Sequence, residues 1–173
     1  SEQRIAIPNG IPSLPVNEIT ATTVPTEHSK SVSSALRCLT VGRLAPQKGL
    51  DTLITAASII EKSDCHIHYE LAGEGPIRDA IVSEVHSRGL AQQFRFLGFR
   101  TDIDALLAEA DIVIQPSVRE GLSIVLLEAM RQGKPIIAAA IGSNLEASNY
   151  GETAELFEAN NHQALADSIH DLI

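Results

Sequence analysis

Two glutamates, Glu120 and Glu128, stand eight residues apart at either end of the apolar segment "GLSIVLL". A carboxylate among Ile, Val and Leu side chains is costly to bury unless a partner group pairs with it. We expect Glu120 in a loop and Glu128 about two turns inside the helix that follows. In one interpretation the two acids accept hydrogen bonds from hydroxyls of a sugar or ribose, or face a cation. In the other, Glu120 is a simple loop acid and Glu128 reaches solvent.

Two cations, Arg43 and Lys48, lie five residues apart in the glycine-bounded segment "GRLAPQKG". Guanidinium and ammonium groups at this spacing could clamp a diphosphate, and the alternative is two solvated surface charges. The segment is not a P-loop, because it lacks the Gly-Lys-Ser/Thr ending. The helix that we expect to begin near Leu122 adds unpaired backbone amides, which attract anions.

Other chemically suggestive residues favour structural interpretations. The segment "GEGP" lacks the third glycine of a dinucleotide fingerprint, since Arg78 stands there, and indicates a tight turn. We expect Asp102 to cap a helix and Asp104 to lie in its first turn. His66 and His68 alternate along a strand without a third metal ligand, and no Gly-x-Ser-x-Gly elbow exists.

Short apolar runs alternate with amphipathic segments after residue 35, whereas residues 1–34 combine a short strand and turn with a Pro-, Ser- and Thr-rich linker. The alternation predicts an α/β fold, a doubly wound, Rossmann-like parallel sheet with helices on both faces over residues 35–173. The expected strands are "ALRCLTV", "IHYELAG", "FRFLG", "DIVIQP" and "PIIAAA". The expected helices are "LDTLITAASIIEK", "PIRDAIVSEVHSR", "DIDALLAEA", "LSIVLLEAMRQ" and "HQALADSIHDLI". Ligands of such sheets bind beyond the carboxyl ends of the strands, where the glycine-rich loops fall.

The composition excludes some partners. The 173 residues carry a net charge of -9, which argues against a nucleic-acid surface or an anionic membrane patch. The two cysteines lie in apolar, strand-like runs, so we expect buried free thiols in a reducing compartment. No apolar run approaches the length of a membrane span.

The segments "VGRLAPQKG", "LAGEGP", "FRFLGFR", "ADIVIQPSVREGLSIVLLEAMRQGKPIIAA" and "IGSNLEASNYG" follow one another in order. Together they resemble the C-terminal, donor-binding domain of a retaining GT-B-fold glycosyltransferase of family 4 (glycosyl transferases group 1). The resemblance covers residues 35–173, and the E-x7-E element is its most specific part. Gly142-Ser143 replaces the usual Gly-Gly, and Ala154 replaces a glycine, which leaves the sugar specificity open.

The resemblance implies a role for each matching residue. Glu120 would contact the hydroxyls of the donor sugar, and Glu128 the ribose hydroxyls of the nucleotide. Arg43 and Lys48 would hold the diphosphate and stabilise the leaving group. Sugar and phosphate would meet the backbone of Leu122, Ser123, Ile124 and Val125, and the base would meet the main chain of Phe99 and Arg100.

The family further implies that the donor is a nucleotide-diphosphate sugar and that neither a metal nor another cofactor is required. The acceptor would bind a second, N-terminal domain outside this chain, so we expect the chain alone to be inactive or nearly so. Polysaccharide, lipopolysaccharide or glycolipid synthesis is the expected role, in the cytoplasm or peripherally at the inner face of the membrane through that other half. The alternatives are a GT-B-type nucleotide-sugar epimerase and a non-enzymatic doubly wound binding domain.

Overall fold

The computed structural model describes residues 35–60 and 66–172, and the expectation of a strand, turn and linker in residues 1–34 lies outside these ranges. The described residues form a six-stranded, wholly parallel sheet in the order β3-β2-β1-β4-β5-β6. The strands are β1 (Leu36–Val41), β2 (Ile67–Ala72), β3 (Phe94–Gly98), β4 (Ile112–Gln115), β5 (Ile136–Ala139) and β6 (Glu155–Phe157).

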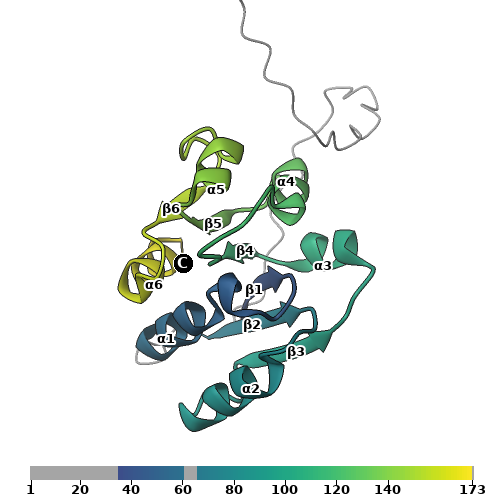
Figure 1. The fold of residues 1–173 in the computed structure, drawn as a ribbon, viewed down its shortest axis with the longest axis vertical. Coiled ribbons are helices and arrows are strands. Elements are labelled where there is room, and N and C mark those ends of the chain that lie inside the picture. Colours follow the sequence, from purple (N-terminus) through teal and green to yellow (C-terminus); the bar gives the residue numbers. More distant parts are fainter. Residues whose placement is uncertain (1–34, 61–65, 173) are drawn as a thin grey trace, which may run out of the picture. The chain divides into compact units, whose positions relative to one another are not determined.

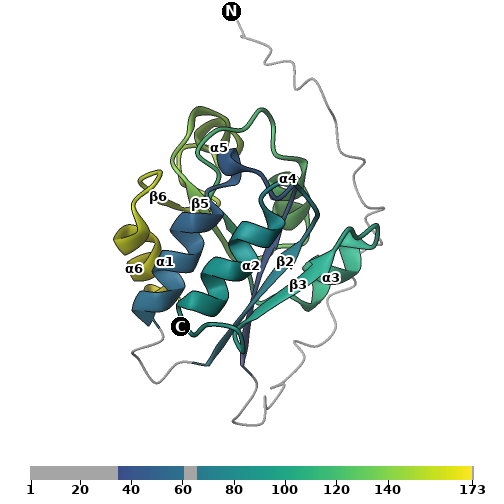
Figure 2. The same cartoon turned by 60° about the horizontal axis from the view of Figure 1, so that its bottom comes forward.

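Helices cover both faces of this sheet (Figures 1 and 2). On one face α1 (Leu50–Ile60) packs between α2 (Arg78–Ser87) and α6 (His162–Asp171). On the other face lie α3 (Ile103–Glu109) and α4 (Ile124–Arg131), with α5 (Gly142–Ala147) beside α4. A one-turn 3-10 helix, η1 (Pro46–Lys48), precedes α1. The α/β, doubly wound prediction is therefore confirmed.

The core consists of one hydrophobic cluster on each face of the sheet. Ile54 and Leu165 belong to the cluster under α1 and α6, and Leu107 and Leu126 to the cluster under α3 and α4. Cys38 on β1 is buried with a free thiol, and burial, reinforced by the charge of Asp111, raises its pKa to about 12. The thiol is thus a neutral core group at physiological pH.

The order of connection reverses beside β1. From β1 the chain moves through α1 and α2 to β2 and β3 on one side, and then crosses by α3 to β4 on the other side of β1. The carboxyl ends of β1 and β4 are consequently adjacent, and the chain continues from them to helices on opposite faces of the sheet. This switch point is where ligands of open parallel sheets bind, so the topology points to the loops that follow β1 and β4.

Three sequence expectations need correction. The expected helix near Leu122 begins at Ile124, because Ser123 takes the N-cap position. Asp102 occupies the N-cap of α3 without a capping hydrogen bond, since its carboxylate binds Arg100 instead. The prediction also missed α5 and β6, which have six and three residues and are too short for a periodic pattern.

Among the described residues, none of the helices combines the length and the apolar character that crossing a membrane demands.

Candidate donor-binding site

The loops after β1 and β4 are joined through their backbones. The Val118 amide donates to the Gln47 carbonyl oxygen over 2.9 Å, and the Arg119 amide reaches the same oxygen over 3.5 Å. These bonds continue the contact between the two strands beyond their ends, so the loops form one unit at the switch point. The unit carries Lys48 from one strand connection and Glu120 from the other.

Lys48 and Glu120 form an ion pair across this unit. The Lys48 Nζ lies 2.8 Å from Oε1 and 2.9 Å from Oε2 of Glu120, so the ammonium group contacts both carboxylate oxygens. Each side chain is 17% exposed. With Gln47, Arg119 and Gly121, the pair lines an open hollow of about 370 Å³. Two of the three predicted catalytic residues are therefore brought together, and each satisfies the other's charge.

Arg43 lies at the next part of the same edge. It is exposed and forms no ion pair with any residue in the ranges that the structure describes. It lines a largely apolar hollow of about 420 Å³ together with Phe99 and Arg100, the two residues expected to meet a base. Phe99 is 77% exposed, although aromatic side chains of this size are usually covered. An exposed ring beside a cation suits a flat, anionic ligand.

Glu74 also lines the hollow beside Arg43, and the sequence assigned it no role. By its sequence, the segment "GEGP" indicates only a turn. The Leu44 amide donates to the Glu74 carbonyl oxygen over 2.9 Å, so the loop after β2 lies against the loop after β1. Glu74 lies in the loop that follows β2. This position at the edge of the sheet was the sequence signal that could have marked Glu74 as a candidate site residue.

Arg100 is held by Asp102 at the side of this hollow. The Arg100 Nε donates to Asp102 Oδ1 over 2.7 Å, and Nη2 donates to Oδ2. The hydrogen bonds from Arg100, followed by a backbone hydrogen bond, hold the pKa of the Asp102 carboxyl below its usual range. The same pair raises the pKa of Arg100 above its ordinary value. The ion pair between Arg100 and Asp102 thus stabilises the conformation of the loop after β3.

The start of α4 faces the same edge of the sheet, since α4 follows β4. Ser123 is 5% exposed, and its Oγ accepts a hydrogen bond from the Leu126 amide over 3.4 Å. The amides of Ile124 and Val125, which precede the capped amide, belong to the free donors of a helix N-terminus. Leu122 and Ile124 expose apolar side chains at this end, being 37% and 52% exposed.

Glu128 lies farther along α4 and is partly buried. It forms no ion pair or side-chain hydrogen bond with the described residues, and it lines neither of the two hollows. Pairing with a protein cation, one of the two interpretations of this acid, is therefore not found within residues 35–60 and 66–172. Its contact with ribose hydroxyls stays a prediction.

Buried polar side chains form the floor between Arg43 and Lys48. Thr40 Oγ1 donates to the Ile114 carbonyl oxygen over 3.0 Å, and Gln115 Nε2 donates to Ser117 Oγ over 3.2 Å. All three side chains line a small hollow of about 10 Å³, the size that holds about one water molecule. This floor ties β1 to β4 below the charged residues, and it keeps their loops in place.

Known proteins resemble this chain in sequence and in structure. An uncharacterised glycosyltransferase of Methanocaldococcus jannaschii is 37% identical over 111 residues, which are 62% of this chain and 28% of that protein. The GDP-mannose-dependent alpha-(1-6)-phosphatidylinositol monomannoside mannosyltransferase of Mycobacterium tuberculosis is 32% identical over 142 residues, 77% of this chain and 37% of that protein.

The crystal structure of Anabaena Alr3699/HepE in complex with UDP matches the fold with a TM-score of 0.72 at 30% identity. The match covers 79% of this chain and 38% of the Anabaena chain. This chain therefore spans well under half the length of these relatives. The model of the family described as "Glycosyl transferases group 1" matches residues 27–173. The GT-B-like fold and this match agree, and the chain belongs to the glycosyl transferases group 1 family.

Proposed function

We propose that this chain is the donor-binding half of a retaining, family 4 glycosyltransferase that uses a nucleotide-diphosphate sugar. The observation that carries the proposal is the meeting of Lys48 and Glu120 at the switch point, with Arg43 beside them. A diphosphate needs cations, and a sugar needs hydrogen-bond acceptors for its hydroxyls. The site offers both kinds of group at one edge of the sheet.

In the proposed reaction the bond between the anomeric carbon of the sugar and the phosphate oxygen breaks, and its electron pair leaves with the diphosphate. Arg43, Lys48 and the free amides at the start of α4 stabilise the negative charge that develops there. Glu120 would stabilise the positive charge that develops on the sugar ring. The acceptor hydroxyl then bonds to the anomeric carbon on the face that retains its configuration, and its proton passes to an oxygen of the departing diphosphate.

The base would lie in the hollow beside Phe99 and Arg100, and Glu128 would accept hydrogen bonds from the ribose. The UDP complex of the Anabaena protein and the GDP-mannose dependence of the mycobacterial relative make UDP and GDP the first candidates. Because these relatives are glycosyltransferases, sugar transfer is favoured over epimerisation. The proposed acceptor belongs to the half of the protein outside this chain, and the proposed location is the cytoplasm, where nucleotide sugars are made.

Calorimetric titration of this chain with UDP, GDP and ADP tests the proposal. We expect one of them to bind without added metal, and equally in EDTA and in magnesium, because protein cations and helix amides supply the positive charge. Lys48→Ala should weaken binding about tenfold to a hundredfold, as expected for a lost charge-assisted hydrogen bond. Glu128→Ala should weaken it about tenfold if the carboxylate binds ribose.

Arg88→Ala is the matched control for a lost cation. Arg88 ends α2, away from the carboxyl edge of the sheet, and pairs with Glu84 over 2.6 Å. Its replacement should leave nucleotide affinity within a factor of about two. Failure of all three nucleotides to bind at millimolar concentration, with the chain folded, would contradict the proposal.

A further inference from the structure

The Lys48–Glu120 pair is tightly confined. A methyl group added at Gly42 would lie 3.1 Å from Lys48 Nζ and 3.2 Å from its Cε, so the lysine side chain runs directly over the end of β1. On its other side, Lys48 is fixed by both oxygens of Glu120. The ammonium group has three N–H donors and the carboxylate about four acceptor sites, so both can still bind a further group, but each charge is already neutralised by the other.

Two arginines near this pair differ from Lys48, because no acid among the described residues neutralises them. Arg43 and Arg119 are both exposed, and neither forms an ion pair with a described residue. Their side chains can therefore bind an incoming anion without first breaking an ion pair. Lys48, like Arg100, is already neutralised, and its partner Glu120 is the acid that the proposed function assigns to the donor sugar.

We propose that Lys48 and Glu120 form a latch that opens fully only for a complete donor. This inference rests on the proposed function. When a nucleotide sugar binds, the diphosphate takes the ammonium group of Lys48, and a sugar hydroxyl takes the carboxylate of Glu120. Both charges keep a partner, so opening the pair costs little.

A nucleoside diphosphate without sugar replaces only one partner. It draws Lys48 away, and it leaves the partly buried carboxylate of Glu120 unpaired and close to a second anion. Unpaired charges in partly desolvated positions are unfavourable, and like charges at short range repel. The closed pair therefore lowers the affinity for the product of transfer and assists its release.

The binding-competent state is the open one, and apparent affinity falls in proportion to its population. Glu120→Gln removes the competing charge, while it keeps the shape of the side chain. It should therefore tighten binding of the nucleoside diphosphate about threefold to fivefold, the upper part of the range expected for a partly exposed ion pair. A substitution in a binding site that improves binding is not the result of simple structural damage.

Calorimetry with UDP, GDP or ADP, whichever binds the wild-type chain, tests this directly. Asp51→Asn is the matched control, because Asp51 is an exposed acid in the first turn of α1, next to the loop that carries Lys48. It removes the same charge without freeing the lysine, so its affinity should stay within about twofold of wild type. In a Lys48→Met background, where no ion pair has to open, Glu120→Gln should tighten binding less than it does in the wild-type background.

Thermal unfolding of each variant verifies that it folds. If Glu120→Gln binds the nucleoside diphosphate no more tightly than wild type does, the latch is wrong while the proposed function stands. An equal gain in Asp51→Asn would also overturn the latch, because the effect would then be general electrostatics. If the wild-type chain binds none of the three nucleotides, both the latch and the proposed function fall.

Discussion

A methyl group placed on Gly49 would lie 2.0 Å from the carbonyl oxygen of Pro116, so the residue after η1 packs directly against the chain that leaves β4. Gly49 also has a φ of 62°, in the left-handed region. The close approach brings the loop of Lys48 onto the loop of Glu120. The pair at the switch point thus depends on a residue that has no side chain.

Gly49→Ala should destabilise the chain by about 2–4 kcal/mol, because it combines left-handed strain with a backbone clash. Nucleotide binding should weaken even at temperatures where the variant is folded, since the loop that carries Lys48 is displaced from its place at the switch point. Urea unfolding and calorimetry measure the two effects. Gly89→Ala is the matched control, because its φ of 78° gives similar strain while its added methyl group contacts nothing. Retained affinity in Gly49→Ala would contradict the role of this contact.

Two substitutions of Ser123 should distinguish an effect on the stability of the chain from an effect on nucleotide binding. Ser123→Ala removes the N-cap of α4 and should lower the free energy of unfolding by about 1 kcal/mol. Ser123→Asp keeps a cap, so its stability should stay near that of wild type, yet its negative charge stands where we expect a phosphate. Nucleotide affinity, measured by calorimetry, should therefore fall more in Ser123→Asp than in Ser123→Ala. The reverse order would contradict an anion site at the start of α4.

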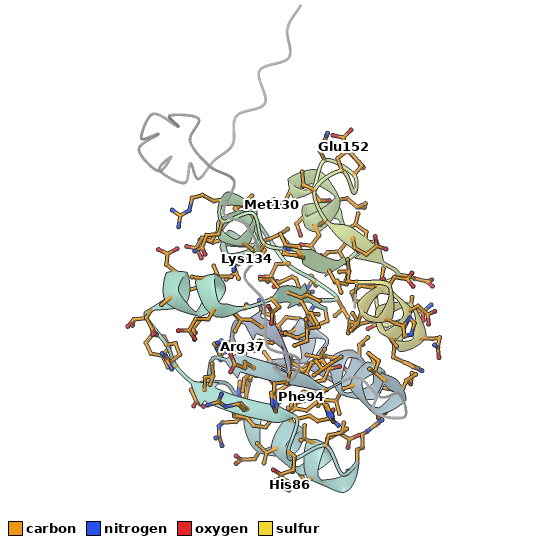
Figure 3. All side chains as sticks on the ribbon, turned by 180° about the vertical axis from the view of Figure 1, so that it is seen from behind. Arg37, His86, Phe94, Met130, Lys134 and Glu152 are labelled. Carbon is orange, nitrogen blue, oxygen red and sulfur yellow. The ribbon has the colours of Figure 1, made fainter. Side chains whose placement is uncertain are left out.

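Glu70 on β2 is a buried carboxylate away from the Lys48–Glu120 pair. It is 2% exposed, and it accepts hydrogen bonds from Arg37 over 2.9 Å and from Arg95 over 3.1 Å. Arg37, labelled in Figure 3, also binds Glu109 on α3, and these hydrogen bonds, led by that of Glu70, raise its pKa. The three strands β1, β2 and β3 are thereby tied together by charge on one face of the sheet.

Glu70→Gln should lower the free energy of unfolding by about 1–3 kcal/mol, less than for a fully buried pair because both arginines reach solvent. Glu109→Gln is the exposed counterpart, with a 61% exposed side chain, and should cost under about 0.5 kcal/mol. Chemical denaturation at neutral pH compares them. Equal losses of unfolding free energy in the two variants would show that the burial of Glu70 adds no stability.

The Arg100–Asp102 pair should respond to acid. The depressed pKa of the Asp102 carboxyl means that its interaction is fully present above the ordinary Asp value of about 3.9, and is lost as pH falls through the lower, folded-state value. Carboxyl NMR titration should therefore show a midpoint below the ordinary value. Arg100→Gln should raise that midpoint, because it removes the largest cause of the shift. An unchanged midpoint would contradict this assignment.

Much of the fold follows from local pattern. The apolar run of β1 and the helical spacing of Leu50, Leu53 and Ile54 in α1 predict their elements, since burial of a face requires those periods. Short elements carry no such pattern. Only the structure revealed the three-residue β6 and the six-residue α5. Neighbouring strands and helices stabilise these short elements.

The sequence by itself determined the alternating elements, the candidate charges and the edge of the sheet where they gather, because periodicity and chain order are local properties. Only the tertiary structure decided which charges are already paired. Lys48 and Glu120 are 72 residues apart, and the reversal of strand order that places β4 beside β1 brings them into contact. Side-chain pairing over such a separation depends on backbone packing between loops, and no local pattern encodes it.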